Sequence, residues 1–128
     1  MKVSLTLRLI FICMLVNISC SKSKNTNDNE APVITLNSPF DNQVFTAGQT
    51  IQITGTVTDN KTVAELHVHV NNNNTSAILL DTHQYPNSPS TNFTESLTAV
   101  AGIQYRIEIL TIDAAVNESR KVIFVTCN

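Results

Sequence analysis

The sequence contains no tryptophan and only two tyrosines in 128 residues. Proteins that bind carbohydrate usually stack sugar rings on exposed aromatic side chains, and this chain offers little surface of that kind. It also lacks the residue spacings of a nucleophile elbow, a phosphate-binding loop or a His-Glu-x-x-His zinc site. These absences give no support to catalysis, and we expect a protein that is not an enzyme.

Positive charge is scarce as well. Eight Lys and Arg residues stand against ten Asp and Glu residues, which gives a formal net charge of −2 at pH 7. Binding to nucleic acid requires a basic surface that neutralises phosphates. The charge balance therefore argues against nucleic acid as a partner.

Residues 1–19 have the pattern of a secretory signal. Lys2 and Arg8 precede the apolar run LIFICMLV, which is too short for a membrane-spanning helix. The segment ends in NISC, with a small residue directly before Cys20, and this arrangement resembles the lipobox of bacterial lipoproteins. Asn17 departs from that pattern, which usually has Leu at this position. The resemblance implies cleavage before Cys20, acylation of this cysteine and attachment to a membrane.

Lipidation would leave one free thiol. Cys13 is removed with the signal and Cys20 carries the lipid, so Cys127 has no partner for a disulfide. The cleaved chain keeps six basic and all ten acidic residues, a net charge of about −4. We expect a lipid-anchored protein of the bacterial cell envelope. Ser21 is compatible with sorting to the outer membrane, and both the periplasmic and the external side remain open.

Residues 20–30 form the expected tether. After Cys20 the stretch SKSKNTNDNE contains no apolar residue. Such a segment cannot bury surface to offset the entropy of ordering, so we expect a disordered spacer. The remaining residues, 31–128, have the length of one sandwich domain of about 100 residues.

Residues 31–128 are rich in short alternating runs separated by turn residues. In IQITGTVTDN the apolar residues Ile51, Ile53 and Val57 share one face. TVAELHVHVN places Ala64, Leu66, Val68 and Val70 inward, and AGIQYRIEILTID does the same with Ile103, Tyr105, Ile107 and Ile109. No segment has a helical period. The pattern predicts an all-β, antiparallel sandwich of about seven strands.

Two stretches, VTDNKTVAELHVHVN and TIDAAVNESRKVIFV, carry a family resemblance. They are similar to the Asp-Asn turn and the Asp-x-x-Gly-Asn turn of bacterial Ig-like and cadherin-like domains. With PVITLNSPFDNQVFTAGQTIQITGTV, the chain resembles Ig-like lipoproteins of Bacteroidetes-type bacteria, which implies an immunoglobulin-like fold and an envelope location. Val116 stands where the turn usually has Gly; because Val tolerates positive φ badly, we expect a different turn or a positive φ at Asn117. Tyr105 is expected to form a tyrosine corner.

The stretch ELHVHV raises a metal hypothesis. His67 and His69 are two residues apart on a predicted strand, so they share a face. A turn near residues 73–75 pairs this strand with the next and puts Asp81 and His83 opposite the two histidines, with Glu65 one step along. Imidazole and carboxylate groups could bind Zn²⁺ or a similar ion. Two alternatives stay open: an ordinary solvated face, and a pH-sensitive or partner-binding face.

The acidic residues Asp59, Asp113 and Asp41 lie at expected strand ends. In cadherin-like domains such residues bind Ca²⁺, but Asp also caps turns with its own side chain. The irregular stretch YPNSPSTNF, residues 85–93, is a candidate recognition loop. Our leading hypothesis is a lipid-anchored, non-enzymatic module for binding, adhesion or structure, with an unknown protein or glycan partner and no cofactor. The alternative is a metal-binding lipoprotein that uses His67, His69, Asp81 and His83.

Overall fold

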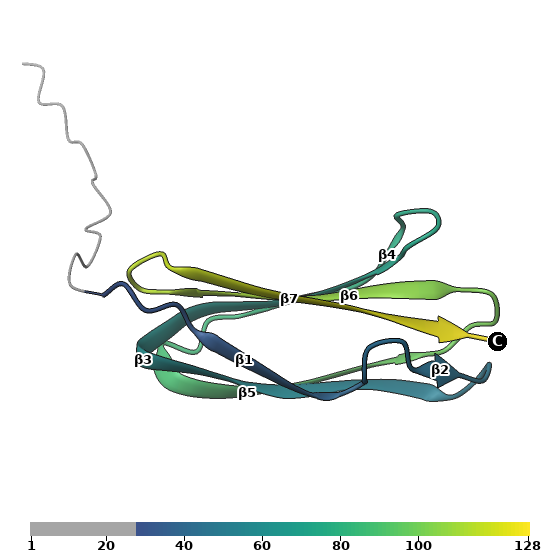
Figure 1. Cartoon of the computed structure of the whole chain (residues 1–128), viewed down its shortest axis with the longest axis horizontal. Coiled ribbons are helices and arrows are strands. Elements are labelled where there is room, and N and C mark those ends of the chain that lie inside the picture. Colours follow the sequence, from purple (N-terminus) through teal and green to yellow (C-terminus); the bar gives the residue numbers. More distant parts are fainter. Residues whose placement is uncertain (1–27) are drawn as a thin grey trace, which may run out of the picture.

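A computed structural model describes residues 28–128, which form seven strands and no helix (Figure 1). Their bounds are β1 Val33–Ser38, β2 Val44–Phe45, β3 Thr50–Asn72, β4 Ile78–Gln84, β5 Ser88–Thr98, β6 Gln104–Asp113 and β7 Glu118–Cys127. Among these residues there is accordingly no helix that could span a membrane. The predictions for the signal, for Cys20 and for most of the tether lie outside the described residues.

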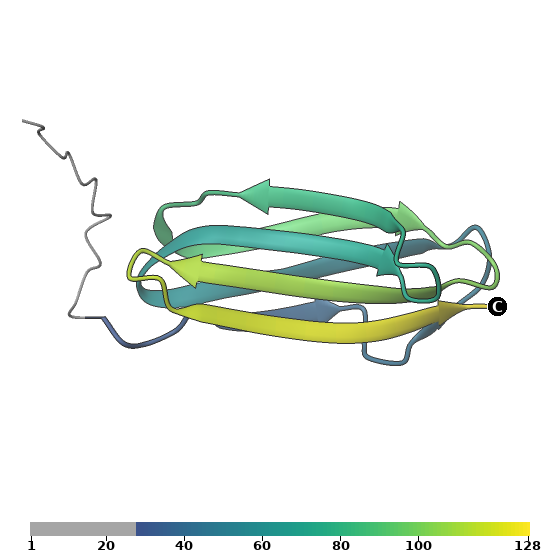
Figure 2. The same cartoon turned by 90° about the horizontal axis from the view of Figure 1, so that it is seen from above.

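The long strand β3 belongs to both layers of a sandwich. Its first half pairs with β1 and β5, whereas its second half pairs with β4 and β6. β7 then pairs with β6 and, on its other side, with β2. The two layers face each other in Figure 1, and Figure 2 shows the second layer from above. This arrangement confirms the predicted Ig-like sandwich, with the correction that the short β2 runs parallel to β7.

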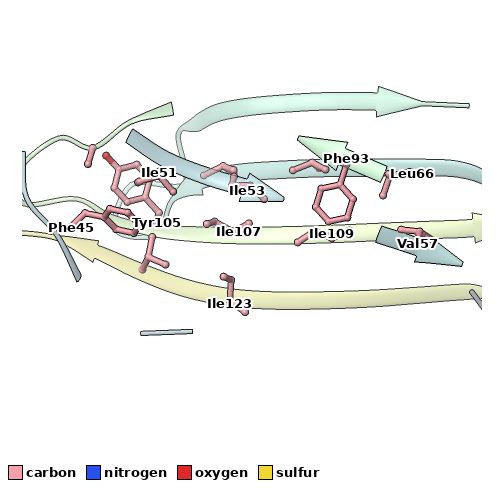
Figure 3. Packing of buried hydrophobic residues seen from close by; sticks show 14 of the residues in the cluster. Phe45, Ile51, Ile53, Val57, Leu66, Phe93, Tyr105, Ile107, Ile109 and Ile123 are labelled. Atoms are coloured by element: carbon pink, nitrogen blue, oxygen red, sulfur yellow. The ribbon is translucent and has the colours of Figure 1, made fainter. Parts of the chain in front are cut away.

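The core lies between the layers and follows the predicted alternation. Ile51, Ile53 and Val57 of β3 are fully buried, as are the apolar residues of β6 that face them (Figure 3). The outward neighbours of these β3 residues are polar, whereas those of β6 include Leu110 beside Ile109. Burial of apolar side chains is the main source of stability in a chain whose described part has no disulfide. Cys127 itself is a buried free thiol.

One inward position differs from the prediction. Val63, and not Ala64, is fully buried with Leu66. The pairing of β3 with β6 shifts between Val63 and Glu65. A bulge of this kind inserts one residue and reverses the alternation locally, so the strict period of two is wrong at this corner.

The turn between β6 and β7 corrects a second prediction. We expected a different turn or a positive φ at Asn117. Instead, Val116 itself has a φ of 71°. Its side chain is exposed, so it does not clash with the core. The backbone of the turn is fixed by Asp113, whose carbonyl accepts a hydrogen bond from Val116 N at 3.2 Å.

Tyr105 confirms the expected tyrosine corner. Its ring is buried at the start of β6, and its hydroxyl accepts a hydrogen bond from Val100 N at 2.8 Å. The bond joins the strand to the loop that precedes it. This loop is thereby held against the end of the core.

The expected recognition loop at residues 85–93 is wrong in extent, because β5 already begins at Ser88. Pro89 fits in that strand because β5 pairs only with β3 among the described strands, and an edge strand tolerates a missing backbone donor. The pairing of β5 also shifts at this point, so no partner is assigned to Pro89. Only residues 85–87 remain as a loop.

Candidate metal centres

The hairpin of β3 and β4 brings the predicted histidine face together. Opposite partners are His67 with His83 and His69 with Asp81, so the predicted residues share one face, although a turn centred near residues 73–75 would have paired His67 with Asp81. Asn72 N donates to Ala77 O at 2.8 Å and Ser76 N donates to Asn72 O at 2.7 Å, which closes the turn. The inward residues of the hairpin enter the core, and so the histidines must point outward.

One oxygen atom, Asp81 Oδ1, is the centre of the cluster. It forms a hydrogen bond with His67 Nε2, and it lies 3.7 Å from both His83 Nε2 and His69 Nδ1. Ligand atoms of His67, Asp81 and His83 all lie within 4.8 Å of one another. His69 is not in that set, so the structure brings three of the four predicted ligands fully together and places the fourth beside them.

The rings are packed as well as hydrogen-bonded. His67 and His83 stack with their centroids 3.8 Å apart and their planes at 21°. His69 meets His67 edge-on at 5.8 Å. On the far side of His83, its Nδ1 lies 3.2 Å from Glu65 Oε1. Each imidazole therefore has a defined orientation on the sheet.

The electrostatics of Asp81 follow from this packing. The hydrogen bond with His67 lowers the pKa of the Asp81 carboxyl, and the charges of His67, His69 and His83 act in the same direction. Partial desolvation opposes them. The carboxylate is therefore the favoured form of Asp81 wherever the cluster is intact.

A second cluster lies at the end of the sandwich opposite the turn at residues 73–77. It joins Asp28, Asp59 and Asp113, whose ligand atoms also lie within 4.8 Å of one another. Asp28 and Asp113 are buried, with 6% and 2% of their surface exposed. Asp59 and Asp113 were predicted from the sequence, but Asp28 was not, because it falls in a polar stretch without any periodic pattern. Asp41 is elsewhere, where its Oδ1 accepts from Phe124 N at 2.9 Å.

The hydrogen bonds of this cluster leave one acceptor unused. Asp59 Oδ2 accepts from Lys61 N at 2.8 Å and from Thr62 N at 2.6 Å. Asp59 Oδ1 is buried and has no hydrogen-bond partner among the described residues. Lys61 Nζ lies 3.8 Å from Asp28 Oδ2. Three carboxylates thus lie close together, and one of them keeps a buried acceptor without a partner among the described residues.

Asn117 connects the cluster to the N-terminal segment. Its Nδ2 donates to Asp113 Oδ2 at 2.6 Å and to the carbonyl oxygens of Asp28 and Glu30, both at 3.2 Å. Asn60 Nδ2 donates to Asp28 Oδ1 at 3.1 Å. Residues 28–30, which belong to the expected tether, are therefore fastened to this end of the sandwich.

Comparison with solved structures gives the same fold. Fibronectin(III)-like modules of CbhA from Clostridium thermocellum are 22% identical, with a TM-score of 0.51, over 74% of this chain and 94% of that one. A superoxide reductase (neelaredoxin) from Ignicoccus hospitalis is 11% identical, with a TM-score of 0.52, over 83% and 86%. OgpA from Akkermansia muciniphila is 15% identical, with a TM-score of 0.50, and this chain spans only 29% of it. At these identities the likeness concerns the fold alone.

The sequence comparison is more specific. No curated protein matches the chain. Residues 32–109, more than half of the chain, match the family described as Bacterial Ig domain. This range includes β1 to β5, both histidine-bearing strands and most of β6. The chain therefore belongs to the bacterial Ig domain family.

Proposed function

We propose that this protein is a non-enzymatic binding, adhesion or structural module of the bacterial cell envelope, anchored by a lipid on Cys20. The observation that carries the proposal is the attachment of Asp28 to one end of the sandwich. A chain that enters at this end and begins in a lipobox-like sequence would hold the opposite end, with the turn at residues 73–77, away from the membrane (Figure 1). The partner would be a protein or a glycan, since the acidic chain does not suit nucleic acid.

The location proposed is the outer membrane of a Bacteroidetes-type bacterium, supported by Ser21 and by the sequence resemblance. Cys20→Ala tests the anchor. Fractionation should show the protein released from membranes or retained as an uncleaved precursor. Normal cleavage with unchanged membrane retention would contradict lipidation, and Cys127→Ser serves as the matched control that should leave retention unaltered.

We propose a second role for the acidic cluster, a structural Ca²⁺ site at the tether end. The observation that favours it is the buried Asp59 Oδ1, which has no partner among the described residues and lies in a cluster with two further carboxylates. Ca²⁺ takes oxygen ligands in flexible geometry, and this cluster supplies three carboxylates. Bound Ca²⁺ would stabilise the docking of the N-terminal segment.

A thermal melt with and without Ca²⁺ tests this role. Ca²⁺ should raise the Tm of the native protein, and Asp59→Asn should abolish the rise, because an ion that binds only the folded state stabilises it. Asp81→Asn, which removes a carboxylate from the other cluster, should keep the full response. Equal responses of native protein and Asp59→Asn would rule the site out.

A further inference from the structure

All three histidines of the sequence lie in one cluster on the outer face of one hairpin. We propose that His67, Asp81 and His83 form a binding site for a divalent transition-metal ion of the zinc and copper class. His69 stands beside this site as an additional ligand, and Glu65 orients His83. This inference does not depend on the lipid anchor or on the acidic cluster, and it adds a ligand class to the module.

The ligand atoms already have nearly the spacing of a metal site. Zinc bonds to nitrogen and oxygen of about 2.0–2.2 Å place neighbouring ligands of a tetrahedral site roughly 3.3–3.6 Å apart. His83 Nε2 and His69 Nδ1 are each 3.7 Å from Asp81 Oδ1, close to that spacing. His67 Nε2 is in hydrogen-bond contact with the same oxygen and needs only to withdraw slightly. A bound ion would thus replace the hydrogen bond between His67 and Asp81 by a coordination bond to each of them.

Glu65 lies where it can orient the ring of His83. Its Oε1 lies 3.2 Å from His83 Nδ1, so the carboxylate can hold the proton on this nitrogen. The other nitrogen, Nε2, is then unprotonated and faces Asp81. Metal-binding histidines usually have a carboxylate or carbonyl at the second ring nitrogen, which fixes the tautomer and the ring orientation.

The sheet gives the ligands a rigid frame. β3 is flanked by β4 and β6 at this point, and the inward neighbours of the histidines, Leu66 and Val68, are buried in the core. Ligands on paired strands keep their spacing better than ligands on loops. The side chains of His67 and Asp81 remain 21% and 42% exposed, so an ion can enter from solvent.

The donor set selects the class of ion. Imidazole nitrogens suit zinc, copper and nickel, whereas Ca²⁺ and Mg²⁺ require an oxygen shell. A set of two or three nitrogens with one carboxylate oxygen therefore favours Zn²⁺ over Ca²⁺. The two clusters of this domain should differ in the ions they accept.

Titration of the full chain in detergent with Zn²⁺, followed by calorimetry and by the imidazole NMR signals, tests the proposal. One Zn²⁺ should bind per chain with micromolar affinity, and Ca²⁺ should not shift the imidazole signals. The double variant His67→Ala, His83→Ala should lose the binding. Glu65→Gln should weaken it by roughly 10- to 100-fold, the usual effect of removing such an outer partner. Glu118→Gln, which removes an exposed carboxylate outside both clusters, is the control and should bind Zn²⁺ as the native protein does.

Three results would overturn the proposal. The first is the absence of saturable Zn²⁺ binding in the native protein. The second is binding that survives the double histidine variant, which would place the ion at another group. The third is native affinity in Glu65→Gln together with unchanged imidazole signals, which would mean that the histidines are only a solvated surface. The melting temperature of each variant without Zn²⁺ verifies that it is folded.

Discussion

The ring of Phe93 on β5 occupies the space that a side chain at Gly55 on β3 would need. The two residues are opposite partners, and a Cβ at Gly55 would lie 2.5 Å from the Phe93 ring and 2.4 Å from the carbonyl oxygen of Thr35. Gly55 stands between the inward residues Ile53 and Val57, where the alternation demands a buried side chain. Phe93 fills that place from the neighbouring strand.

Gly55→Ala should therefore destabilise the domain by about 3 kcal/mol, the upper part of the range for overpacked cores, because a backbone atom as well as the ring must move. Chemical denaturation would measure the change. Gln52→Ala, on the exposed side of the same strand, should alter stability by no more than about 0.5 kcal/mol. A Gly55→Ala domain as stable as this control would show that β1 or β5 shifts without cost.

Val116→Asn should stabilise the domain. A β-branched residue at a φ of 71° costs about 1–2 kcal/mol, and Asn tolerates this region better. The exposed Val116 side chain makes little packing that could be lost, so a gain of about 1 kcal/mol should appear as a higher Tm. Val116→Ala keeps most of the strain and is the control. A lower Tm for Val116→Asn than for Val116→Ala would contradict the conformational explanation.

Tyr105→Phe should cost about 1–2 kcal/mol. The change leaves the ring in the core but removes the hydroxyl that accepts from Val100 N, so a backbone donor loses its partner. Denaturation should show the loss, and hydrogen exchange should show faster exchange at Val100 than in the native protein. Unaltered exchange at this amide would mean that the tyrosine corner does not hold the loop.

The pH dependence of the metal-free protein tests the interaction of His67 with Asp81. Because that interaction lowers the pKa of Asp81, the stabilisation is present above the ordinary aspartate value of 3.8 and is lost as the pH falls through the lower native value. The Tm difference between native protein and Asp81→Asn should therefore be largest near about pH 5 and shrink towards about pH 2. A difference that stays constant over this interval would contradict the lowered pKa.

His67 and His69 should contribute unequally to Zn²⁺ binding. His67 belongs to the set of three close ligands, whereas His69 lies outside that set, with its Nδ1 3.7 Å from Asp81 Oδ1. His67→Ala should therefore weaken Zn²⁺ binding more than His69→Ala in the same calorimetric titration. The reverse order would show that the ion binds between His69 and Asp81, on the other side of the cluster.

The histidine hairpin was predictable because its information is local. Alternation fixes which side of each strand faces the core, and the asparagine-rich turn joins the two strands as a hairpin, so that a pairing two residues away from the expected one keeps the same residues on the outward face. The acidic cluster was only partly predictable. Asp59 and Asp113 follow from turn positions, but Asp28 meets Asn117 across 89 residues of sequence, and no pattern near Asp28 announces that contact.

The other differences between the predicted and the observed structure also come from contacts that are distant in the sequence. The bulge at Val63 interrupts a regular period where β3 passes from one layer to the other. The positive φ of Val116 contradicts a residue preference because the tertiary contacts of the turn outweigh it. Preferences of single residues describe the isolated chain, whereas these positions are decided by what packs around them.

The contact of Asn117 with the backbone at Asp28 and Glu30 also determines how the domain would bear tension. A pull from the N-terminal side reaches Asp28 before it reaches β1. Since Asn117 holds this point to the turn between β6 and β7, the load is divided between the first strand and the last hairpin. The domain can then resist being peeled open from β1 alone.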